Sequence, residues 1–209
     1  MFASELSTLP FGISNSAYMP YDVLSKANGG DEDVEAYQFR MTRASLAATL
    51  AHGTIQCAWR NHFGIFDKLV RAYDRFGVDK AEFVGYWRNP ATVAGASDVY
   101  VSCYVRDGKA LAVVSHLGKP HVDQTPEITF DWAKLGVVPP SRAVDVMTAP
   151  DPEYAALFER RAKYRIPVSR VTLKLGDFGT KVESFDGKTL KLRLPHHTFS
   201  LVEASLFLV

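Results

Sequence analysis

The second half of this chain consists of short, apolar-rich runs divided by turn signals, and this pattern constrains the fold most strongly. Two runs, 99–105 and 110–115, flank Arg106-Asp107-Gly108-Lys109, and Asp-Gly between apolar runs is a strong β-hairpin signal. Further runs lie at 127–132, 142–146, 170–175, 189–194 and 198–202. Many short strands at similar spacing favour an antiparallel sandwich or barrel over a parallel sheet.

Apolar positions within these runs predict the core of a sandwich that begins near residue 90. Alternate residues of a strand point to opposite faces of its sheet, so a set at matching positions should share one buried face. The positions expected in this core are Val101, Cys103, Val113, Phe130, Leu173, Leu192 and Leu201.

In the first half of the chain, the spacing of the apolar residues predicts helices. Apolar residues recur at helical spacing over 33–52 and again over 63–76, and Gly53 and Gly77 follow as stop signals. Residues 151–165 fit either a short helix or a long loop. The sequence therefore predicts an α+β protein with a helical segment at 1–86 and an antiparallel β-sandwich at 87–209.

Charge and cysteine content exclude several classes of protein. The chain has 24 Lys and Arg against 23 Asp and Glu, and the basic residues form no stripe, so we expect no nucleic-acid partner. No run approaches the length of a membrane span, and the first twenty residues lack the pattern of a secretion signal. Cys57 and Cys103 form no C-x-x-C pair, which predicts two reduced, buried thiols. Nothing in the sequence assigns a cellular location.

One group of polar and aromatic residues suggests a sugar-binding loop between the two helices. His52, Trp59, Arg60 and Asn61 lie close together in the sequence. An indole face can stack on a sugar ring while an imidazole, a guanidinium and an amide bind its hydroxyls, so these four are the candidate substrate-binding residues. The structural alternative is that His52 contacts carbonyls at the helix end and Trp59 only packs.

Other candidate residues have simpler interpretations. Glu82 lies in an alternating run that predicts a strand, with its carboxylate either on the solvent-exposed face or paired to Arg88. We expect His116 and His121 to be solvated, and the pair His196-His197 is a weak metal signal without spaced partners. Glycoside hydrolysis needs two carboxyl groups about 5–10 Å apart, and no such pair is identifiable. The sequence thus predicts no cofactor and no metal, and leaves any catalytic residues unknown.

Several strings resemble the C-terminal part of certain glycoside hydrolases. They are Phe66-Asp67-Lys68-Leu69-Val70-Arg71-Ala72-Tyr73-Asp74-Arg75-Phe76-Gly77, Ala81-Glu82-Phe83-Val84-Gly85-Tyr86-Trp87, Val101-Ser102, Val113-Val114-Ser115, and the later runs 143–148 and 190–199. In alpha-galactosidase-like enzymes, a (β/α)8 barrel is followed by an antiparallel sandwich. The resemblance implies that residues 1–86 are the end of such a barrel. A whole barrel needs about 250 residues, so most of it and its catalytic carboxylates would lie outside this chain.

Two functions remain open from the sequence. The first is the C-terminal portion of a carbohydrate-active enzyme, whose sandwich supports a barrel. The alternative is a stand-alone module without catalysis, either structural or binding carbohydrate through exposed Trp59, Trp87 or Trp132. A large uncovered apolar face on the helices would indicate a missing barrel, or self-association through that face.

Overall fold

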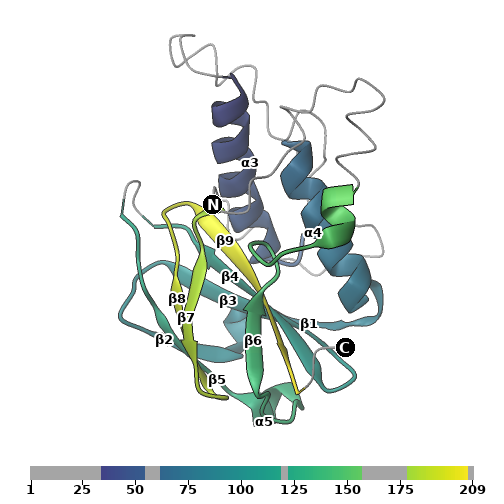
Figure 1. Cartoon of the computed structure of the whole chain (residues 1–209). Coiled ribbons are helices and arrows are strands. Elements are labelled where there is room, and N and C mark those ends of the chain that lie inside the picture. Colours follow the sequence, from purple (N-terminus) through teal and green to yellow (C-terminus); the bar gives the residue numbers. More distant parts are fainter. Residues whose placement is uncertain (1–33, 55–61, 119–121, 157–177, 207–209) are drawn as a thin grey trace.

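The protein has three layers, which we describe from a computed structural model that defines residues 34–54, 62–118, 122–156 and 178–206. Two helices lie on one face of a five-stranded sheet, and a four-stranded sheet lies on the other face (Figure 1). Both sheets are entirely antiparallel. The predicted α+β class with antiparallel sheets is therefore confirmed.

The five-stranded sheet forms the middle layer. Its strand order is β1 (Glu82–Val84), β3 (Val99–Arg106), β4 (Lys109–His116), β9 (Thr198–Ser205) and β6 (Arg142–Asp145). The outer sheet has the order β2 (Ala91–Ala94), β5 (Glu127–Phe130), β8 (Thr189–Arg193) and β7 (Lys181–Phe185). Short 3-10 turns, η1 (Val78–Lys80) and η2 (Tyr86–Arg88), bracket β1.

Local sequence signals set the ends of several elements. Helix α3 covers Val34–Leu50 and α4 covers Phe63–Phe76, in close agreement with the predicted helices. Gly77 adopts a left-handed conformation with φ of 77°, and its N–H donates to the carbonyls of Tyr73 and Asp74. Asp107 and Gly108 both have positive φ, which forms the tight turn of the predicted hairpin between β3 and β4.

The core has two parts because the middle sheet is buried on both faces. Val101, Cys103, Phe130 and Leu192 lie between the two sheets. Val113 and Leu201, with Leu111 and Phe199, instead face the helices. Six of the seven predicted core residues are buried, and Leu173 lies outside the described residues. The expectation that all share one face is wrong, because β4 and β9 are central strands of a middle layer.

The middle sheet covers the apolar stripes of both helices. Leu46, Leu50, Phe66 and Leu69 are buried in the same cluster as residues of β4 and β9. In the described parts of α3 and α4, Val70 alone among the large hydrophobic residues is exposed, at 42%. The large uncovered apolar face considered from the sequence is therefore not found on the described parts of these helices.

Some strand limits differ from the predicted ones. The run 127–132 ends as a strand at Phe130, and Trp132 instead begins a short helix, α5 (Trp132–Leu135), that Asp131 caps by accepting from the Lys134 N–H. Strands β2 and β7 were not predicted, since they are short and half exposed. The predicted strand at 170–175 lies outside the described residues. Among the helices that the structure describes, none is long and apolar enough to cross a membrane.

Candidate functional site

His52 lies where the chain leaves α3 and takes part in an aromatic cluster. Its Nδ1 is 2.8 Å from the carbonyl oxygen of Ala48, so the ring occupies the helix end as the structural interpretation predicts. Its Nε2 is 3.4 Å from the hydroxyl of Tyr86. Trp59, Arg60 and Asn61 fall outside the described residues. The assignment of these four residues to sugar binding therefore stays a prediction.

Trp87 is the exposed member of this aromatic cluster. Its indole stacks on His52 with 6.2 Å between ring centroids and meets Tyr86 and Phe83 edge-on. The side chain is 43% exposed. The ring passes so close to Gly85 that a Cβ added there would lie 2.4 Å from indole carbons. Glycine at this position is therefore what allows the indole to lie against the backbone.

Substituting Gly85→Ala should displace the Trp87 indole, because a Cβ and the ring cannot share that space. We expect a destabilisation of about 1–3 kcal/mol, typical of local overpacking, and a shifted indole N–H signal for Trp87 in a ¹H–¹⁵N NMR spectrum. The control for the indole signal is Gly95→Ala, where the added Cβ meets nothing within 4 Å, although the positive φ of 72° makes alanine itself costly there. An unchanged Trp87 signal in Gly85→Ala would contradict this packing.

Other residues singled out from the sequence have structural contacts. Glu82 pairs with Arg88 at 3.4 Å on the surface, as predicted. Cys103 is free and buried, also as predicted, and burial raises the pKa of its thiol to about 12; Cys57 is not described. His116 is buried, with Nδ1 3.2 Å from the Pro195 carbonyl, so its predicted solvent exposure is wrong. The error arose because β9 pairs along β4 and encloses its last residue.

In the described part of the chain, the remaining histidines form no metal centre. His196 lies 3.5 Å from a carboxylate oxygen of Asp123, and His197 Nε2 lies 2.8 Å from the Gly118 carbonyl oxygen. Within the described ranges, no group of three or more His, Cys, Asp or Glu side chains could hold a metal ion. His121 falls outside those ranges.

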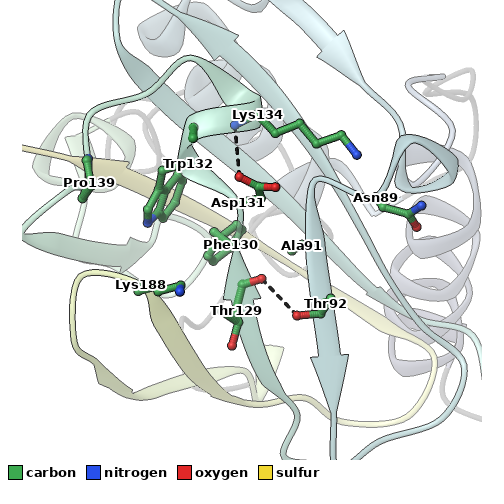
Figure 2. Close-up of a pocket in the computed structure, with 11 residues that line it drawn as sticks. Asn89, Ala91, Thr92, Thr129, Phe130, Asp131, Trp132, Lys134, Pro139 and Lys188 are labelled. Carbon is green, nitrogen blue, oxygen red and sulfur yellow. Dashed lines mark hydrogen bonds between the residues drawn. The ribbon is translucent and has the colours of Figure 1, made fainter.

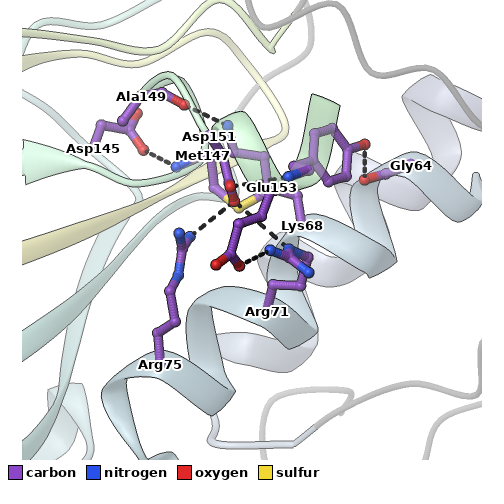
Figure 3. Close-up of polar contacts among 10 residues, drawn as sticks. Gly64, Lys68, Arg71, Arg75, Asp145, Met147, Ala149, Asp151 and Glu153 are labelled. Carbon is purple, nitrogen blue, oxygen red and sulfur yellow. Dashed lines mark hydrogen bonds and ion pairs between the residues drawn. The ribbon is translucent and has the colours of Figure 1, made fainter. Parts of the chain in front are cut away.

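A cluster of charged residues joins α4 to the segment that follows β6 (Figure 3). Arg75 contacts the Asp151 carboxylate at 3.2 Å and Arg71 contacts it at 3.7 Å. Arg71 also pairs with Glu153 at 2.5 Å. Fully buried Lys68 donates to the carbonyl oxygen of Ala149 at 2.7 Å. These contacts hold the helical layer to the sheet layers through charged groups in addition to the apolar core.

Two buried groups in this cluster have shifted pKa values. Burial lowers the pKa of Lys68 to about 8, although nearby Asp151 and Asp145 oppose this. Burial raises the pKa of Asp145 despite the hydrogen bond from Thr180 and the one from the Met147 N–H. Shifted pKa values are common at catalytic sites, but here both side chains are sealed from solvent. In this structure Lys68 and Asp145 therefore contribute to packing between the helices and the sheet.

An open groove lies on the outer sheet (Figure 2). We call it the sheet groove; it has a volume of about 670 Å³, and its lining includes Asn89, Thr92, Asp131, Lys134, Pro139 and Lys188. Beneath it, Trp132 stacks on Phe130 with centroids 4.5 Å apart and donates from its indole N–H to the Gly187 carbonyl. Trp132 is only 4% exposed, so it offers no open indole face to a sugar ring.

The sheet groove lacks the carboxylate pair of a glycosidase. Its lining contains one carboxylate, Asp131, whereas the general mechanism of glycoside hydrolysis needs two flanking the bond. The groove has a mixed character, with ammonium, amide, hydroxyl and carboxylate groups around an apolar floor. This composition suits binding and not acid–base catalysis of glycosidic bonds.

The sequence did not reveal the sheet groove because its walls come from separate segments. They belong to the β1–β2 connection, β2, β5, α5, the α5–β6 connection and the β7–β8 turn. One signal was available: Asp131-Trp132-Ala133-Lys134 combines a cap residue with a helical turn, which would have ended the strand at Phe130.

Comparison with known proteins gives one match. Residues 67–174 match the family described as glycoside hydrolase 123, C-terminal domain. The match begins within α4 and covers β1 to β6. It supports a glycoside hydrolase C-terminal domain and gives no support to the finer alpha-galactosidase likeness. No curated protein and no solved structure matches the chain.

Proposed function

We propose a supporting, non-catalytic role, starting from the premise that this chain belongs to the glycoside hydrolase 123 C-terminal domain family, which it matches over more than half of its length. In this role the domain stabilises the catalytic domain of a glycoside hydrolase. The observation that supports the proposal most directly is the junction of α4 with the sheets. Lys68, Arg71 and Arg75 all lie on that helix and contact the segment after β6.

This junction suggests how support would be transmitted. The helices share one core with β4 and β9, so α3, α4 and the middle sheet should move as one body. A catalytic domain anchored to the helices would then be held by the whole sandwich. That residues 1–86 are the end of a barrel, with a domain boundary at 86 and 87, remains part of this proposal.

The stand-alone alternative gains less support. An aromatic binding platform needs exposed rings, and of the two tryptophans in the described ranges only Trp87 is exposed. The first function therefore remains the better explanation of the family match, and carbohydrate contact would be secondary to support.

The purified chain should hydrolyse no aryl glycoside above the uncatalysed rate, because its one groove carboxylate cannot act as both acid and nucleophile. The measurement is release of nitrophenol from a panel of aryl glycosides. Turnover that Asp131→Asn abolishes would contradict the proposal.

Support itself needs a second measurement on an enzyme that carries this domain. Deleting the domain should lower the Tm of the catalytic domain, while the Michaelis constant of enzyme that is still folded should change little. A catalytic domain with the same Tm after deletion would rule out the supporting role.

A further inference from the structure

We infer that the sheet groove binds an uncharged saccharide. The groove lies on the outer sheet, on the side of the molecule opposite to α3 and α4 (Figures 1 and 2). A catalytic domain held by the helices would leave it open. The choice of a saccharide rests on the proposed function, since the domain belongs to proteins that act on glycosides.

The polar groups of the groove combine donors with an acceptor. Figure 2 shows Asp131 beside the backbone of Lys134, whose side chain extends away from the carboxylate toward Asn89. One Asp131 oxygen accepts the Lys134 backbone N–H at 3.1 Å, which leaves the second oxygen for a ligand. Neither lysine ammonium forms a salt bridge with a carboxylate of the described residues. Asn89, at the rim, adds an amide that can donate and accept.

Threonine hydroxyls extend this polar surface along the sheet. Thr92 of β2 is directly opposite Thr129 of β5, which is opposite Thr189 of β8. Thr92 donates to the Thr129 carbonyl over a long 3.5 Å, and the hydroxyls of Thr129 and Thr189 are 3.2 Å apart. Each hydroxyl keeps accepting capacity on its oxygen, so the row can bind further hydroxyl groups.

The shape and apolar parts of the groove fit a sugar ring. Its volume of about 670 Å³ falls within the usual range for ligand clefts. Ala91, Ala133 and Pro139 contribute apolar surface between the polar groups, which suits the C–H face of a pyranose.

The charge arrangement favours an uncharged ligand. An anion near the centre would meet the Asp131 carboxylate, and a cation would meet Lys134 and Lys188. A sugar hydroxyl both donates and accepts, so it can satisfy the carboxylate and an ammonium at the same time. Hydrogen bonds to charged groups are the stronger kind.

The test is a titration of the chain with maltotriose, cellotriose and triacetylchitotriose, followed by ¹H–¹⁵N NMR. At least one of them should give saturable shifts with a Kd of about 1 mM or below. The indole N–H of Trp132 should shift, because it bonds to Gly187 beside Lys188, and that of Trp87 should not.

Matched variants identify the groups that bind. Asp131→Asn retains a capping side chain but removes the charge, and Lys188→Met removes an ammonium. Each should weaken binding roughly tenfold. Lys109→Met, at the first residue of β4, is the control and should leave the Kd unchanged.

Three results would overturn the inference: no saturable shift with any trisaccharide, wild-type affinity in both Asp131→Asn and Lys188→Met, or binding of acidic sugars alone with loss at high salt. None of these depends on hydrolysis or on the Tm of a catalytic domain. Failure of the supporting role would therefore be recognised separately from failure of the groove.

Discussion

An Asp151→Ala variant is expected to lose about 3 kcal/mol of unfolding free energy, as when one partner of a buried ion pair is removed. The Asp151 side chain is 3% exposed and lies beside Arg75 and Arg71. It also accepts the Tyr154 N–H and attracts buried Lys68. Water screens the charges of the two partly exposed arginines. Most of the loss should therefore come from the lost attraction between Asp151 and Lys68, and from the Tyr154 N–H that is left without an acceptor. Urea denaturation at neutral pH measures the change.

The neighbouring carboxylate Glu153 provides a matched control. It pairs with the same Arg71 but is 79% exposed, and exposed ion pairs contribute at most about 1 kcal/mol. Glu153→Ala should therefore lose less than about 1 kcal/mol. Equal losses in the two variants would mean that burial does not set the strength of this junction.

Acid should reveal the same junction in the wild-type chain. Burial alone would raise the pKa of Asp151, but the hydrogen bond from Tyr154 and the charges of Arg75, Arg71 and Lys68 outweigh it and lower the pKa. A lowered folded-state pKa gives stability that is fully present above the unfolded pKa of about 3.9 and is lost as pH falls through the folded value. The stability difference between wild type and Asp151→Ala should therefore shrink below about pH 4.

Leu69→Ala should destabilise the chain by about 2–5 kcal/mol, the usual range for truncating a fully buried leucine. Leu69 lies on α4 with no exposed surface and packs in the cluster shared by the helices and the middle sheet. The truncation would leave a cavity between these layers. Thermal and urea unfolding should both report the loss.

Val70 is the control for Leu69, since it is the next residue on the same helix but is 42% exposed. Val70→Ala removes two methyl groups that are partly exposed to water. We expect the free energy of unfolding to change by no more than about 0.5 kcal/mol. A loss as large as that of Leu69→Ala would show that another part of the protein covers Val70, as a bound catalytic domain would.

Local sequence predicted those parts of the fold that short-range physics controls. The end of α4 at Gly77 needs only one residue that tolerates positive φ. The hairpin needs only two adjacent residues of this kind, Asp107 and Gly108. The position of His52 at the end of α3 followed from the helical period and from Gly53. Each of these depends on neighbours within a few residues, so the sequence reports it directly.

Tertiary structure decided which faces are buried. The burial of His116, and the division of Val113 and Leu201 from Val101 and Leu192, depend on β9 pairing with β4 about ninety residues away in the sequence. A period of two indicates that a strand has two faces, but it does not say that a helix covers one and a second sheet the other.

The sequence by itself determined the antiparallel α+β class and the ends of its best-defined elements, because these depend on local propensity and turn geometry. Tertiary structure alone decided the sheet groove and the charged junction. Asn89, Asp131 and Lys188 meet in the groove, and Lys68 meets Ala149 in the junction, only after strands and helices far apart in the chain have packed. Long-range packing carries no local period, and that is the physical reason why these sites could not be predicted from the sequence.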